Sequence, residues 1–148
     1  MRCELWWSRS SARIKAMPQP DLPFIAHVTC LVPDYDEAIA WFTRMLGFRV
    51  FDDTDLGAGK RWVLVGPKEG VRLLLAKAAT PGQVASIGQQ GGGRAFLFLH
   101  PDDFARDHAA FMARGVRFLE APRHEPYGTV AVFEHLCGNR WDLLEPKA

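Results

Sequence analysis

One order of residue types occurs twice along this chain, and the repeat constrains the fold more than any other feature. Asp34 is followed 13 positions later by Gly47, and Asp102 is followed at the same distance by Gly115. An apolar-Arg-apolar triplet comes directly after each glycine, and short apolar runs flank both segments. Repeats of this size are typical of structural units that complete one another's core. The sequence therefore predicts two β-α-β-β-β units in tandem, with a site between them.

The repeat divides the chain into four parts. We expect an N-terminal leader or arm over residues 1–22, a first βαβββ unit over 23–77, a glycine-rich linker over 78–93 and a second βαβββ unit over 94–148. A chain of 148 residues suffices for one domain, or for two small units that share a core. Because strands dominate and helices are few, the predicted fold class is α+β.

Helix and strand signals place the elements within each unit. In the first unit, Asp34 or Asp36 caps a helix whose apolar residues recur at three- and four-residue spacing until Gly47 ends it. We expect residues 52–59 and 121–128 to be loops. The expected strands are 24–32, 48–51, 61–66, 71–77, 94–100, 116–120, 129–134 and 140–145, and the second helix is 102–114.

Charge and cysteine usage restrict the possible partners. The formal net charge is +1, so no overall field attracts the chain to nucleic acid. No apolar run approaches membrane-spanning length. The three cysteines form no CxxC or CxxH pattern and suit a reducing compartment. We therefore expect a cytoplasmic protein whose partner is a small organic molecule rather than a nucleic acid or a membrane.

The N-terminal leader differs from the rest of the chain. It is basic, and its longest apolar run, Leu5-Trp6-Trp7, is too short for the core of a secretory signal. Met17 offers a second possible start, so our hypothesis is that the leader is translated upstream sequence. If the leader packs on something, we expect Trp6 and Trp7 to anchor it.

Motifs in both units resemble those of a known family. They are Asp34, Ala38-Ile-Ala-Trp-Phe42 and Leu46-Gly-Phe48 in the first unit, and Gly115-Val116, Glu125-Pro-Tyr-Gly128 and Gly138-Asn-Arg-Trp-Asp-Leu-Leu-Glu-Pro146 in the second. Over about residues 24 to 146, the chain resembles the vicinal oxygen chelate superfamily, which includes glyoxalase I, bleomycin-resistance proteins and extradiol dioxygenases. The resemblance implies curled mixed sheets that enclose a cleft, and a homodimer. It leaves the activity open, because one scaffold hosts many chemistries.

Metal-using members of this family carry a ligand on the first and the last strand of each unit. In this sequence those four positions fall on His27, near Leu73, on Phe96 and on Asp142. Only two of them have donor side chains, whereas a metal site needs three or four converging donors. We therefore expect no metal and no other cofactor; if a metal were bound, His27 and Asp142 would hold it.

The two donor positions also have a metal-free interpretation. Asp142 is costly to bury alone, so it faces a wet cleft or pairs with a base such as His27, Arg72 or Arg94. A His27–Asp142 couple could transfer protons or orient a ligand, while a core histidine is an equal alternative for His27. The expected catalytic residues are thus His27 and Asp142. The expected ligand-binding residues are His27, Trp62, Leu73, Phe96, Phe98, Tyr127 and Asp142.

The remaining aromatic and histidine side chains are expected to lie in the core or in solvated loops rather than in a site. Aromatic residues on the helix faces, Trp41, Phe42, Phe104 and Phe111, are expected in the core. His124 and His135 lie in expected loops and are predicted to be solvated.

Three functions remain open from the sequence. The first, favoured by Leu73 and Phe96, is a metal-independent protein of the glyoxalase/bleomycin-resistance type that binds an apolar or aromatic ligand in the cleft between the units. The second is a metal-dependent enzyme of the glyoxalase or dioxygenase type, a lyase or dioxygenase in which the metal acts as a Lewis acid. The third is a metal-free isomerase that uses His27 and Asp142.

Overall fold

The computed structural model describes residues 22–148. The expectations for the leader, including the anchoring role of Trp6 and Trp7 and the start at Met17, lie outside the described residues.

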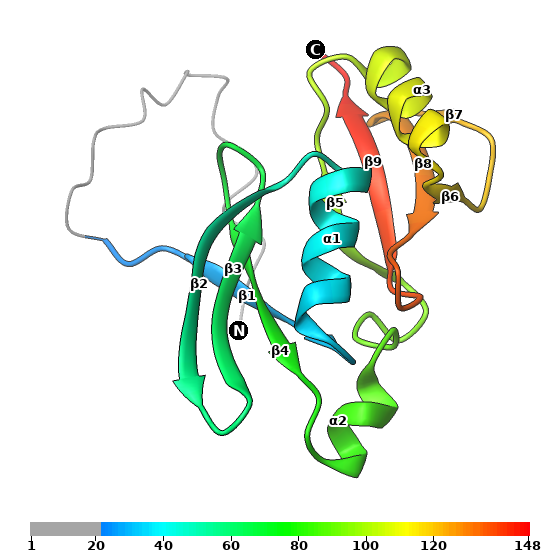
Figure 1. Ribbon diagram of the computed structural model, residues 1–148. Helices are drawn as coiled ribbons and strands as arrows, with labels where there is room; N and C mark the ends of the chain where they lie inside the picture. Colours follow the sequence, from blue (N-terminus) through cyan, green and yellow to red (C-terminus); the bar gives the residue numbers. More distant parts are fainter. Residues whose placement is uncertain (1–21) are drawn as a thin grey trace, which may run out of the picture.

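Strands dominate the described part of the chain (Figure 1). The elements are β1 (His27–Val32), α1 (Tyr35–Met45), β2 (Arg49–Gly57), β3 (Lys60–Gly66), β4 (Arg72–Lys77), α2 (Pro81–Ser86), β5 (Ala95–Leu99), α3 (Phe104–Arg114), β6 (Arg117–Phe118), β7 (Arg123–Glu125), β8 (Gly128–Glu134) and β9 (Arg140–Pro146). Within residues 22–148, no helix combines the length and the apolar character that crossing a membrane requires.

The strands form two mixed sheets, and each sheet comes from one of the two repeated segments. The first sheet has the order β1-β4-β3-β2, and the second has the order β5-β9-β8-β6 with β7 paired to β8. In each sheet the first strand of the unit runs parallel to the last, as β1 beside β4 and β5 beside β9, and the other pairs are antiparallel. Over the described residues the two sheets stay separate rather than closing into a barrel. The arrangement confirms the α+β class with two tandem units.

Both long helices begin after an aspartate N-cap, although α3 begins at Phe104 rather than at the expected residue 102. The Asp34 carboxylate accepts a hydrogen bond from the backbone N–H of Glu37 at 2.8 Å, which satisfies a free donor in the first turn of α1. α3 begins after Asp103 in the same way. It ends at Gly115, whose φ of 98° lies in the left-handed region that glycine adopts without strain.

One hydrophobic core joins the two units. Phe42 of α1 is fully buried, and its ring centroid lies 5.6 Å from that of Phe48 and 5.9 Å from that of Trp141 in the second unit. Figure 1 shows α1, in cyan, beside both sheets. The prediction of core positions is confirmed for Phe42, Phe104 and Phe111, while Trp41 packs against the core as a half-buried residue.

Two segments that were expected to be loops contain strands. β2 continues to Gly57, through the polar residues 52–57, and pairs with β3 along this length. It lies at the edge of the first sheet, where charged side chains remain solvated and oppose pairing with another chain. The prediction of a loop at 52–59, which relied on polarity alone, is therefore wrong over residues 52–57. The segment 121–128 was predicted to be a loop for the same reason, but it contains the short strand β7.

The glycine-rich linker, residues 78–93, contains α2 and contacts both units. The side-chain oxygen of Gln90 accepts from the backbone N–H of Leu31 at 2.8 Å, and its Nε2 donates to the carbonyl oxygen of Thr29 at 2.9 Å. The backbone N–H of Gln90 donates to Oδ1 of Asn139 at 3.0 Å. The amide thus satisfies the free edge of β1 as a neighbouring strand would.

Candidate functional site

Several predicted site residues lie on the faces of the sheets that point away from the core. Side chains alternate between the two faces along a strand. On β1, Cys30 and Val32 are fully buried in the core, so His27 projects from the opposite side and is exposed. By the same alternation Trp62 and Arg72 share that side. We call this surface, defined by His27, Trp62 and Arg72, the open face of the first sheet.

His27 has a π-system and a cation as its neighbours on this face. Its ring meets that of Trp62 edge-on, with 6.2 Å between centroids and 73° between planes. Arg72 lies directly across on β4, and its guanidinium carbon is 3.7 Å from the centroid of the Phe51 ring. Exposed rings and a stacked guanidinium favour contact with flat organic groups.

Leu73 lies on the core side of β4. It is 3% exposed and is paired with Val28 and Val65. Because one step along a strand reverses the face, Arg72 rather than Leu73 shares the face of His27.

Asp142 lies on the corresponding open face of the second sheet, defined by Phe98, Val132 and Asp142. Its strand neighbours across the sheet are Phe98, which is 59% exposed, and Val132. Partial burial raises the pKa of the Asp142 carboxyl, the charge of Glu120 raises it further, and Arg123 opposes both. This carboxylate is therefore a polar group at the margin of an apolar surface.

Arg123 organises the hairpin beside Asp142, and the sequence argument missed it. Its Nε donates to Glu120 at 3.0 Å, and its Nη1 donates to Glu125 at 2.7 Å and to the Tyr127 hydroxyl at 3.4 Å. Glu120 also accepts from the backbone N–H of β8 at residue 132, at 3.2 Å. These contacts tie β7 and Tyr127 to the strand next to Asp142. Acidic residues flank Arg123 in the sequence and could have indicated these ion pairs. Because the segment was expected to be a loop, no strand register predicted which side chains would meet.

The donor set does not fit a metal of the kind that the family resemblance implies. Of the four family positions, only His27 on β1 and Asp142 on β9 carry donor side chains. The position across from His27 holds Arg72, whose guanidinium offers no lone pair to an ion. Within residues 22–148, no three His, Cys, Asp or Glu side chains gather closely enough to hold one.

An open groove of about 550 Å³ lies between the two units, and we call it the apolar groove. It is lined by residues of β1 and β4 and by the whole of β5 except its first residue. Three predicted ligand-binding residues, Leu73, Phe96 and Phe98, border it. His27, Trp62 and Asp142 are not part of its lining and lie on the open faces; Tyr127, in the turn between β7 and β8, is outside the lining as well.

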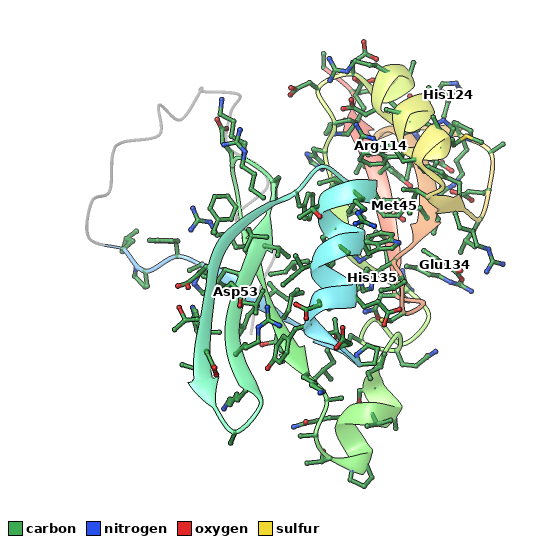
Figure 2. The ribbon with its side chains drawn as sticks, in the orientation of Figure 1. Met45, Asp53, Arg114, His124, Glu134 and His135 are labelled. Carbon is green, nitrogen blue, oxygen red and sulfur yellow. The ribbon has the colours of Figure 1, made fainter. Side chains whose placement is uncertain are left out.

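His135 was predicted to be solvated, and this prediction is wrong. It is 2% exposed, and its ring stacks on that of Phe42 with 4.7 Å between centroids. Figure 2 shows it beside α1, at the turn that follows β8. His124 is exposed as predicted, with Nδ1 3.1 Å from the Thr129 hydroxyl.

Comparisons with known proteins agree with this architecture. A sequence model of the Glyoxalase/Bleomycin resistance protein/Dioxygenase superfamily matches residues 24–143. An uncharacterised protein of Shewanella frigidimarina is 49% identical over 124 residues, which cover 82% of this chain and 92% of that protein. The crystal structure of UcmS2 has a TM-score of 0.73 at 30% identity, covering 84% of this chain and 98% of its own. TnmS3, an antibiotic binding protein from Streptomyces sp. CB03234, has a TM-score of 0.70 at 26% identity, covering 86% and 98%. The chain therefore belongs to the glyoxalase/bleomycin resistance protein/dioxygenase superfamily.

Proposed function

We propose that this protein is a metal-independent small-molecule-binding protein that holds an apolar or aromatic organic ligand in the cleft between its two units. The apolar groove is the observation that carries the proposal. Its volume of about 550 Å³ falls within the ~300–1,000 Å³ of typical small-molecule sites. Phe96 and Phe98 offer rings from the second unit; from the first unit Val71, which is 42% exposed, offers apolar surface, and the nearly buried Leu73 borders the groove.

Structural similarity to a binding protein supports this function. TnmS3 is an antibiotic binding protein, and its fold and length match those of this chain. The chemistry at the family's metal positions supports metal independence, because the cation Arg72 lies across from His27 and the hydrocarbon ring of Phe98 lies across from Asp142.

We further propose that polar residues on the open faces orient the ligand. Asp142 would accept a hydrogen bond from a ligand that lies on Phe98, and Tyr127 would border the same surface. His27 and Trp62 would offer equivalent contacts from the first sheet. If Asp142 has this role, Asp142→Asn should weaken binding while leaving the fold intact, as measured by calorimetry and circular dichroism.

A titration with a fluorescent aromatic probe tests the function. We expect 1-anilinonaphthalene-8-sulfonate to bind the native protein saturably at one site per chain. Phe98→Ala should weaken this binding by about tenfold, since it removes an exposed ring from the groove. Prior dialysis against a chelator should leave the affinity unchanged.

Met112→Ala is the matched control. Met112 is 56% exposed on α3, outside the groove, so its removal tests whether the probe follows exposed hydrocarbon in general. Equal losses in the two variants would contradict the proposal. So would loss of binding on chelation that added Zn²⁺ or Mn²⁺ restores, because a metal would then hold the ligand.

We also propose that the protein is a cytoplasmic homodimer. Phe24 and Ile25, just before β1, are 85% and 73% exposed, which is unusual for neighbouring large apolar residues. A second copy that covers them would remove this surface from water.

A further inference from the structure

A second groove continues the apolar groove and differs from it in chemistry. It measures about 600 Å³ and lies between the turn after β3 and the N-terminal half of the second unit. Charged side chains from separate elements line it: Lys68, Glu69, Asp102, Asp107 and Arg114. We call it the polar groove.

The two grooves adjoin one another. Five residues line both of them: Phe48, Pro67, Glu69, Leu99 and His100. A ligand seated on Phe98 in the apolar groove can therefore extend past Glu69 and His100 into the polar groove without leaving the protein surface.

Much of the charge in the polar groove is unpaired. Among the hydrogen bonds and ion pairs of residues 22–148, none involves the side chains of Lys68, Glu69, His100 or Asp102. Asp107 forms an ion pair at 2.9 Å with Arg106, which is not part of the groove lining. Arg114 reaches the carbonyl oxygen of Met45 at 3.4 Å, and Figure 2 shows these two residues near one another. The groove thus offers free donors and free acceptors together.

This mixture selects for a neutral group with several hydroxyls. A cationic substituent would be attracted by Glu69 and Asp102 but repelled by Lys68 and Arg114, and the reverse holds for an anionic one, so a single charge of either sign gains little. A hydroxyl both donates and accepts, and it can satisfy a carboxylate and an ammonium group in turn. Because exposed charges lose little hydration on such contacts, the gain should be modest.

We infer that the cleft takes a two-part ligand: a flat apolar ring system in the apolar groove that carries a neutral polyhydroxylated substituent, such as a sugar, in the polar groove. The inference rests on the proposed function, because the ring-binding half is the site proposed above. It adds a second subsite and a ligand class, the aryl glycosides.

A pair of matched probes tests the inference by isothermal titration calorimetry. We expect 4-methylumbelliferyl β-glucoside to bind the full chain about fivefold more tightly than 4-methylumbelliferone, which lacks the sugar. In the double variant Lys68→Gln/Asp102→Asn, the affinity for the glucoside should fall to that for the aglycone. Glu37→Gln, an exposed carboxylate on α1 outside both grooves, is the matched control and should retain the fivefold preference.

Backbone amide shifts locate the sugar independently of affinity. The glucoside should shift the resonances of Lys68, Asp102 and Asp107, which line the polar groove and not the apolar one, and the aglycone should leave them in place. Equal affinities of the two probes, or a preference that survives in the double variant, would overturn the inference while the proposed function stands. If neither probe binds although 1-anilinonaphthalene-8-sulfonate does, the inference fails alone; if none of the three binds, both proposals fail.

Discussion

At the scale of single residues, His135 shows how far an environment can depart from what its sequence suggests. The ring lies against Trp41 and Phe42, at 4.8 Å and 4.7 Å between centroids. Neither ring nitrogen has a partner within the described residues. Burial lowers the pKa of His135 to about 4, so the neutral imidazole serves as a flat core side chain.

The acid sensitivity of His135 is testable. Its folded pKa of about 4 lies below its ordinary 6.5, so the unfolded chain binds more protons between these values. The contribution of neutral His135 to the free energy of unfolding is complete above about pH 6.5 and is lost as the pH falls toward 4. The loss has an upper bound of about 3 kcal/mol. In His135→Phe this loss should disappear, as measured by urea unfolding between pH 7 and pH 4.5.

His124→Phe is the control for this measurement. His124 is exposed, so its replacement should leave the pH dependence of the unfolding free energy as in the native chain. A His135→Phe protein that loses stability with acid as steeply as the native chain would show that other groups cause the effect.

At the scale of elements, the contacts of a segment decide its structure where its composition is ambiguous. The caps of α1 and α3 are local signals, and these helices were predictable from the sequence. β2 and the segment around Gln90 carry residues typical of loops, but pairing with β3 and with the edge of β1 orders them. The Gln90 contacts join residues 59 and 61 positions apart, so no short-range pattern in the sequence predicts them.

The Gln90 contacts predict a loss of stability that its neighbour should not share. Gln90→Ala removes two hydrogen bonds to the edge of β1 and should lower the free energy of unfolding by about 1–2 kcal/mol. Hydrogen exchange at the Leu31 amide should accelerate. Gln89→Ala, at an exposed position, should change neither quantity, and an equal effect in both variants would refute a specific role for Gln90.

Two glycines near α2 should respond to alanine in opposite directions. Gly88 has a φ of 73°, and a Cβ there would overlap the carbonyl oxygen of Cys137. Gly88→Ala should therefore cost about 2–4 kcal/mol. A Cβ at Gly82 within α2 would meet open space, so Gly82→Ala should stabilise the protein by about 0.5–1 kcal/mol. Thermal unfolding measures both, and similar shifts would contradict the packing described at Gly88.

At the scale of the whole molecule, the shared core and the exposed apolar residues have different consequences. The core makes the two units interdependent, since Phe42 of the first unit packs on Trp141 of the second. The exposed pair Phe24 and Ile25 lies outside this core.

The proposed dimer is measurable by sedimentation equilibrium. We expect a particle of twice the chain mass at micromolar concentration, because burying neighbouring apolar residues favours association. Phe24→Glu should shift the equilibrium toward the monomer, whereas Met112→Glu, at another exposed apolar position on α3, should not. A native chain that remains monomeric at all concentrations would exclude the homodimer.

The sequence by itself determined the repeat, the βαβββ order, the capped helices and the family resemblance, because these depend on residue type and short-range spacing. It also predicted Asp142 and Phe98 as ligand-binding residues, and these two lie side by side on neighbouring strands. Only the tertiary structure decided that Arg72 rather than Leu73 shares the face of His27, that His135 is buried, and that a polar groove continues the apolar one. A shift of one residue in strand register moves a side chain to the opposite face of the sheet, and the local sequence pattern does not fix this register. A cleft forms only where surfaces from separate elements meet, so the local pattern does not predict it either.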